Sequence, residues 1–107
     1  MPGLEDRISG IVKQEYAIDG LLFRLTATAC PEQYDVTDGR GRADGYVRLR
    51  HGTLRVDYPD HDGREIYRRT YPEGQKGCFW DEKERKETLE HIATVIKDER
   101  RRRRSNG

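Results

Sequence analysis

The sequence predicts an α+β fold: a single two-layer domain in which an antiparallel meander sheet of about five to six strands is covered on one face by a C-terminal helix. Apolar and charged residues alternate in the middle of the chain, Gly-containing turns separate the alternating segments, and a helical apolar stripe follows them. Only 33% of the 107 residues are hydrophobic and 38% are charged. Such a chain can bury one small core, so the second face of the sheet is expected to lie in water.

The clearest strand pattern lies between residues 34 and 58, where we expect three antiparallel strands. His51-Gly52 provides a two-residue turn, in which glycine accepts positive φ, and this turn fixes the register of the strands on either side. The inward cross-strand pairs are then aliphatic: Leu49 faces Leu54, and Val47 faces Val56.

The outward face of the same hairpin carries three arginines. The register places Arg48 directly opposite Arg55 with Arg50 diagonal to them, and like charges in this arrangement destabilise a sheet by about a few tenths of a kcal/mol. Neutralisation by Asp35 or Asp57 on neighbouring strands is one explanation, with the arginine stems covering apolar surface. The other is an anion-binding face, on which guanidinium groups bind phosphate or carboxylate in a bidentate manner.

Further strands are expected on both sides of this segment. Asp19-Gly20 favours a tight hairpin turn, and Gly41 can close a second turn that begins at Asp38. The expected strands span residues 14–18, 21–29, 33–37 and 64–71.

Two helices are expected. Asp81 with Glu84 three residues later forms a capping box, and a stripe of apolar residues behind it is predicted to cover the sheet, with Trp80 as a core anchor. A short N-terminal helix is expected over residues 4–15, and an edge strand over residues 8–15 is the alternative because Gly10 lies within a β-branched segment. The apolar stripe of the C-terminal helix comprises Leu89, Ile92, Ala93 and Ile96.

The last helix leads into five consecutive arginines. We expect one domain over residues 1–99 and a basic, mobile tail over residues 100–107. Residues 97–107 carry six basic and two acidic side chains, or +4, which leaves −3 of the net +1 for residues 1–96. A mildly acidic body weakens a general nucleic-acid-binding function, which needs a basic surface on the folded domain.

Cys30 and Cys78 have no metal-ligand spacing, and because no signal peptide pattern precedes them we expect free, partly buried thiols in a reducing compartment, with a disulfide as the alternative. No segment has the pattern of a secretory signal or a membrane span, so the chain is expected to be cytoplasmic without a membrane partner. The acids around His61 do not fit a calcium loop, because Arg69 would occupy the position of the last carboxylate ligand. The three histidines have no paired spacing either, so no metal and no cofactor is expected.

Residues 30–71 contain the segments CPEQYDV, GYVRLRHG and LRVDYP. In these segments the chain resembles short uncharacterised bacterial proteins of mobile elements and prophages. The resemblance implies the same layout of sheet and helix, and it brings no catalytic residues.

Three functional classes compete. An enzyme is disfavoured because no nucleophile, base and orienting group occur in a recognisable signature. The leading hypothesis is a small non-catalytic protein-binding or inhibitory module that uses the exposed Tyr/Arg sheet face, because Tyr and Arg are enriched at interface hot spots. The alternative is a nucleic-acid-binding protein that combines the sheet arginines with the basic tail. The candidate binding residues are Tyr46, Arg48, Arg50, Arg55, Arg100, Arg101, Arg102, Arg103 and Arg104.

The distribution of charge on the sheet distinguishes these two hypotheses. A continuous positive stripe across the folded body would favour nucleic acid, whereas alternating patches of both signs would favour a protein partner. The oligomeric state stays open.

Overall fold

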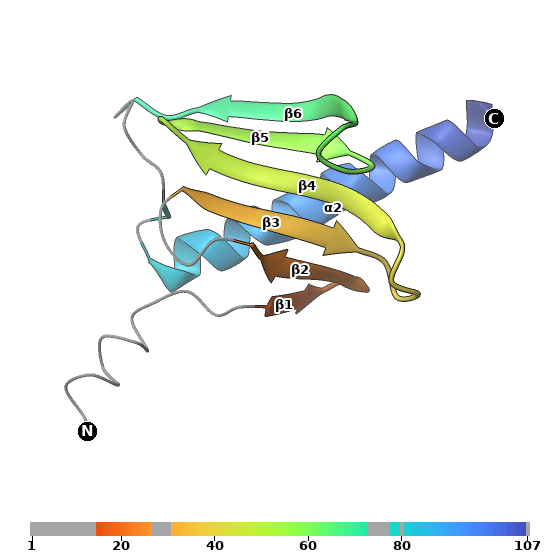
Figure 1. The fold of residues 1–107 in the computed structure, drawn as a ribbon, viewed down its shortest axis with the longest axis horizontal. Coiled ribbons are helices and arrows are strands. Elements are labelled where there is room, and N and C mark those ends of the chain that lie inside the picture. The colour runs from red at the N-terminus through yellow and green to blue at the C-terminus, as the bar shows by residue number, and fades with distance from the viewer. Residues whose placement is uncertain (1–14, 27–30, 73–77, 80, 107) are drawn as a thin grey trace, which may run out of the picture.

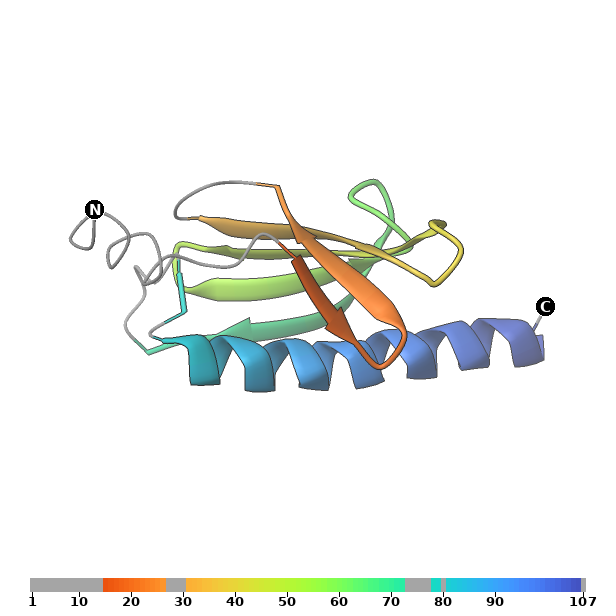
Figure 2. The same cartoon turned by 90° about the horizontal axis from the view of Figure 1, so that it is seen from below.

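The computed structural model describes residues 15–26, 31–72, 78–79 and 81–106. They form one six-stranded antiparallel sheet whose strand order follows the chain order, with helix α2 (Glu82–Asn106) lying along one face (Figures 1 and 2). This confirms the predicted α+β meander. The strands are β1 (Glu15–Ile18), β2 (Leu21–Leu25), β3 (Glu32–Thr37), β4 (Ala43–Arg50), β5 (Thr53–Tyr58) and β6 (Arg64–Thr70).

Some expectations fall on residues that the structure does not describe. These are the N-terminal helix and its alternative strand up to residue 14, the end of the second predicted strand at residues 27–29, and the anchoring role of Trp80. β1 begins at Glu15, and β2 is described as a strand up to Leu25. The described part of the chain contains no helix that is long and apolar enough to cross a membrane.

Two tight turns set the register of the sheet. Asp19 and Gly20 have φ values of 52° and 84°, and His51 and Gly52 have φ values of 52° and 79°. Two successive residues with positive φ are typical of type I′ turns, whose twist matches that of the strands they join. The pairing of β4 with β5 is the one expected from the sequence, with Leu49 opposite Leu54 and Arg48 opposite Arg55.

A longer turn joins β3 to β4. The Asp38 carboxylate oxygen Oδ1 accepts hydrogen bonds from the backbone N–H groups of Arg40 (2.8 Å) and Arg42 (3.0 Å). Gly41 has a φ of 83°, as the predicted turn requires. The turn lies at the opposite end of β4 from the His51-Gly52 turn (Figure 1).

The core lies between the inner face of the sheet and α2. Leu89, Ile92, Ala93 and Ile96 are all 0% exposed, which confirms the predicted stripe. Gly45 allows a close approach of β4 to the helix, because a Cβ atom there would lie 2.8 Å from Ile96 Cδ1. The sheet contributes mainly Leu21, Phe23, Tyr34, Val36, Val47, Leu49, Leu54 and Val56.

Helix α2 starts where the capping pattern predicts. The backbone N–H of Glu84 donates to Asp81 Oδ1 at 2.8 Å, which satisfies one of the free donors of the first turn. The helix continues to Asn106, so residue 100 does not mark an end of secondary structure. Arg100 forms an ion pair with the buried Asp44 of β4, and the Arg103 guanidinium lies 4.7 Å from the centre of the Tyr58 ring. Mobility of residues 100–107 stays a prediction.

A buried ion pair connects the start of α2 to β3. Glu32 is 1% exposed, and its two carboxylate oxygens accept hydrogen bonds from Arg85 Nε at 3.0 Å and Arg85 Nη2 at 2.8 Å. The same carboxylate also accepts the Tyr34 hydroxyl at 2.7 Å and the backbone N–H of Phe79 at 3.0 Å. Burial and the hydrogen bond to Glu32 raise the pKa of Tyr34. Four donors therefore satisfy this buried carboxylate.

Arg85 also connects the network to the edge of the sheet. Its Nη1 donates to Glu82 Oε1 at 2.8 Å, and the Tyr16 hydroxyl of β1 donates to Glu82 Oε2 at 2.8 Å. Burial, with help from Glu82, raises the pKa of Tyr16 to about 12. Residues of β1, β3 and α2 therefore share one hydrogen-bonded network.

Cys78 lies next to this network, and the expectation of free thiols is wrong for it because Cys78 is disulfide-bonded. Cys30, the other cysteine of the sequence, lies outside the described residues. Spacing along the chain does not reveal whether two distant cysteines meet in space, and disulfide formation depends on that spatial distance.

We predict that Ile92→Ala lowers the free energy of unfolding by about 2–5 kcal/mol, because it leaves a cavity between α2 and the sheet. Urea denaturation followed by circular dichroism measures this loss. An unfolding curve that matches the wild type would contradict the packing described for the helix.

We predict that Arg85→Met lowers the free energy of unfolding by about 3–5 kcal/mol, because it leaves the Glu32 carboxylate buried without its cation. The matched control is Arg101→Met, which removes an arginine from the same helix at an exposed ion pair with Asp98. Thermal denaturation should show a large decrease in the midpoint for Arg85→Met and little change for Arg101→Met. Equal midpoints would show that the buried pair does not stabilise the fold.

Candidate functional site

On strands β3 to β6, most charges of the outer face, opposite α2, lie in two neighbouring cross-strand rows. In the arginine row, Arg48 of β4 faces Arg55 of β5, and Arg55 faces Arg68 of β6. The acidic row lies beside it and contains Asp35, Tyr46, Asp57 and Glu65 on the four strands β3 to β6. Over β3 to β6 the two signs of charge are thus separated by row, whereas on β2 and β1 the acidic row continues with Arg24, opposite Asp35, and with Glu15.

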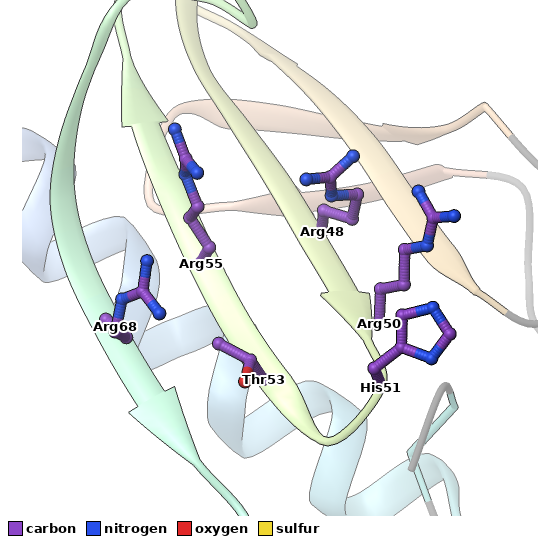
Figure 3. A pocket seen from close by; sticks show the side chains of 6 residues that line it. All are labelled: Arg48, Arg50, His51, Thr53, Arg55 and Arg68. Carbon is purple, nitrogen blue, oxygen red and sulfur yellow. The ribbon is translucent and has the colours of Figure 1, made fainter. Parts of the chain in front are cut away.

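A hollow of about 270 Å³ lies at the arginine row, near the His51-Gly52 turn. In Figure 3, the arginine side chains rise from three neighbouring strands around this common open space. We call this hollow the arginine pocket. Its lining residues are Arg48, Arg50, His51, Thr53, Arg55 and Arg68.

Two of the four arginines are held by carboxylates. Arg55 Nε donates to Asp57 Oδ1 at 2.8 Å and lies 3.5 Å from Glu65 Oε1. Arg68 Nε and Nη2 donate to the Glu65 carboxylate at 3.1 and 2.8 Å. The hydrogen bond from Arg68 lowers the pKa of Glu65. Of the two acids expected to neutralise the outward arginines, Asp57 does so for Arg55. Asp57 is only 5% exposed.

The other two arginines have no such partner. No carboxylate of the residues that the structure describes lies within ion-pair distance of Arg48 or Arg50, both of which point away from α2 on β4. The carboxylates of Asp57 and Glu65 balance only two of the four guanidinium charges, so the pocket keeps a charge of about +2. Such a pocket is suited to binding an anion.

The structure brings Arg48, Arg50 and Arg55 together, but it places Tyr46 outside the pocket. Tyr46 belongs to the acidic row, and its half-buried hydroxyl donates to Gln33 Oε1 at 3.0 Å. Its ring meets the His61 ring edge to face, with 6.0 Å between the centroids. Tyr46 therefore lies on the same sheet face as the pocket without lining it.

The basic segment at the C-terminus lies elsewhere. Helix α2 covers the inner face, and its C-terminal end lies beside Asp44 at the start of β4, far from the His51-Gly52 turn (Figures 1 and 2). Several of its arginines are already paired, Arg101 with Asp98 and both Arg102 and Arg103 with Glu99. Arg104 lines a separate hollow with Asp38 and Arg42. The tail and the arginine pocket therefore cannot act as one continuous surface.

Three lining residues, His51, Thr53 and Arg68, were not among the binding residues expected from the sequence, and Arg68 is the arginine among them. The sequence predicts a strand over residues 64–71, but no tight turn before it fixes its register against β5. A bulge between Val56 and Asp57 shifts this pairing, and the turn before β6 is longer than two residues. The sequence of β6 does not show which face Arg68 takes, because the half-buried residues Ile66 and Tyr67 are adjacent and do not alternate with charged ones.

Asp60, His61 and Asp62 in the turn before β6 bring three ligand-type atoms within 4.8 Å of one another. His61 and Asp62 are exposed. Such clusters are common on protein surfaces, and the expectation that the chain binds no metal stays a prediction.

Comparison with protein families, curated proteins and solved structures finds no match for this chain. The resemblance to bacterial mobile-element proteins therefore stays a prediction from the sequence. Functional conclusions depend on the geometry of the arginine pocket alone.

We predict that the Glu65 carboxylate titrates below its ordinary pKa of 4.5, because Arg68 stabilises the ionised form. The ion pair therefore stabilises the folded state above the ordinary pKa, and this contribution disappears as the pH falls through the lowered value. In an NMR titration of the side-chain carboxyl, Arg68→Gln should raise the midpoint, whereas Arg40→Gln, an exposed arginine of the β3–β4 turn that does not pair with Glu65, should not. A midpoint unchanged by Arg68→Gln would contradict the pairing.

Proposed function

We propose that this chain is a small non-catalytic protein-binding module whose outer sheet face binds an acidic segment of a partner protein. The observation that supports this most directly is the pair Arg48 and Arg50, two cations without carboxylate partners among the described residues, in a pocket that Arg55 and Arg68 complete. A partner that supplies carboxylates or other anions to this pocket would neutralise its charge and use the unoccupied guanidinium donors.

The pattern of charge favours a protein over a nucleic acid. A polynucleotide presents negative charge along its whole length, whereas the unbalanced positive charge of this face is confined to the pocket, and Asp35 in the neighbouring row adds a negative charge. A protein surface can present both signs and match the two rows together. The half-buried Tyr46 adds an aromatic surface of the kind that is common in protein interfaces.

The separation of the C-terminal arginines from the pocket supports the same choice. A nucleic acid bound at the pocket could not contact Arg101 or Arg104 without passing around the molecule, since these lie on the opposite layer and at the opposite end. The nucleic-acid hypothesis required the sheet arginines and the basic tail to contact the same nucleic acid, and their positions do not favour this.

The cytoplasmic location expected from the sequence stays part of this proposal. The sequence also predicts free thiols, as expected in a reducing compartment, and this prediction is wrong for Cys78. Disulfides persist mainly in oxidising compartments, so the range of candidate partners extends to proteins of those compartments.

We predict that a fluorescein-labelled peptide with glutamate at alternate positions binds the full chain at low salt, and that binding weakens as salt increases. Arg48→Gln and Arg50→Gln should each weaken binding about tenfold or more, because each removes charge-assisted hydrogen bonds of about 1.5–3 kcal/mol. Fluorescence anisotropy measures the affinity. Arg40→Gln, which removes the same charge from the exposed β3–β4 turn, is the matched control and should have little effect.

Single-stranded and duplex oligonucleotides serve as the competing ligands in the same assay. Tighter binding of an oligonucleotide than of the acidic peptide, lost in Arg48→Gln, would overturn the protein-binding proposal. Replacement of Arg101, Arg102 and Arg104 by glutamine should leave peptide affinity unchanged, because these side chains lie outside the pocket.

A further inference from the structure

The arginine pocket has more hydrogen-bond donors than a single carboxylate can use. Arg48 and Arg50 have no ion pair within the described residues, and Arg55 uses only its Nε toward Asp57, which leaves its two terminal nitrogens for another acceptor. Arg68 uses Nε and Nη2 toward Glu65 and keeps Nη1. Donors thus converge on the pocket from three strands, whereas a carboxylate offers only two oxygens.

The carboxylates beside the pocket orient its arginines. Asp57 is almost fully buried and binds Arg55 through Nε, the nitrogen nearest the backbone, so the outer end of the guanidinium faces solvent. Glu65 binds Arg68 along one edge and comes within 3.5 Å of Arg55 as well. A guanidinium that is held in this way loses less conformational entropy when it binds a ligand.

The net charge of the pocket matches a doubly charged anion. Four arginines and two carboxylates leave about +2, and a phosphate monoester carries about −1.5 to −2 at neutral pH. Its three terminal oxygens can each accept a hydrogen bond from a different arginine, and the Thr53 hydroxyl at the pocket is a further donor.

The cross-strand register gives independent support. Arg48, Arg55 and Arg68 stand directly opposite one another on three successive strands, an arrangement that like-charge repulsion disfavours. Among the described residues, the Glu65 carboxylate lies between Arg55 and Arg68 and is shared by them. No described carboxylate lies between Arg48 and Arg55 in this way. A dianion placed between Arg48 and Arg55 would remove the remaining repulsion.

We propose that the arginine pocket binds the phosphoryl group of a phosphorylated serine, threonine or tyrosine in the partner protein. This inference rests on the proposed protein-binding function and specifies the group that the pocket recognises. Clusters of arginine are a recurrent way of binding such groups, because the planar guanidinium fork matches two phosphoryl oxygens.

Three labelled peptides of one acidic sequence, with serine, glutamate or phosphoserine at the central position, test the inference with the full chain. The phosphoserine peptide should bind about tenfold or more tightly than the glutamate peptide, and Arg48→Gln should remove most of this advantage. Arg48→Lys should restore only part of it, because lysine keeps the charge and loses the bidentate fork. Arg40→Gln should keep the full advantage.

Inorganic phosphate provides a second measurement that needs no peptide. In NMR spectra of the arginine Nε–Hε groups, titration with phosphate should shift the signals of Arg48, Arg50 and Arg55 and leave that of Arg40 in place. Melting curves should show that Arg48→Gln stays folded, because no described carboxylate depends on Arg48.

The outcomes separate the two proposals. Equal affinity for the glutamate and phosphoserine peptides would overturn the phosphoryl inference and leave the protein-binding function in place. Equal losses from Arg48→Gln and Arg40→Gln would overturn both, because binding would then follow overall charge. Preference for a 5′-phosphorylated oligonucleotide over the phosphopeptide would overturn the choice of a protein as the source of the phosphoryl group.

Discussion

The buried ion pair between Glu32 and Arg85 is the constraint on which the arrangement of sheet and helix depends. An ionised carboxylate in the core is tolerated only when its cation and its hydrogen-bond donors are in place, and these come from α2, β3 and the backbone at Phe79. Each donor has to be correctly positioned for the network to close. The pair therefore specifies where the first turns of α2 meet the sheet.

A second ion pair, between Asp44 and Arg100, holds the other half of the helix. Asp44 stands at the start of β4, and Leu49, near its end, is opposite Glu32, so the two pairs hold α2 at both ends of the longest strand. The apolar stripe between them fills the inner face, and Gly45 allows the close contact with Ile96. With the helix fixed there, the outer face stays uncovered and its charged rows remain open to a ligand.

Sequence reasoning succeeded where one local signal was sufficient. The His51-Gly52 turn determined the pairing of Arg48 with Arg55, and Asp81 marked the start of α2. It failed where two distant segments had to be combined. Glu32 and Arg85 are 53 positions apart, and neither was predicted to lie in the core, because charged residues are seldom buried. A bulge shifts the pairing of β5 with β6, so the position of Arg68 opposite Arg55 could not be read from the sequence. The disulfide state of Cys78 depends on which residues lie close in space, and spacing along the chain does not show this.

The position of β6 at the edge of the sheet has a consequence for self-association. Its backbone donors and acceptors on the outer side are not paired within the described sheet, and an open edge of seven residues can template the addition of another strand. Arg64, Arg68 and Arg69 are exposed along this edge, so a second copy aligned beside it would bring several cations together. The same arginine that completes the pocket thus also protects the edge against aggregation, and a bound anion that neutralised Arg68 would weaken this protection.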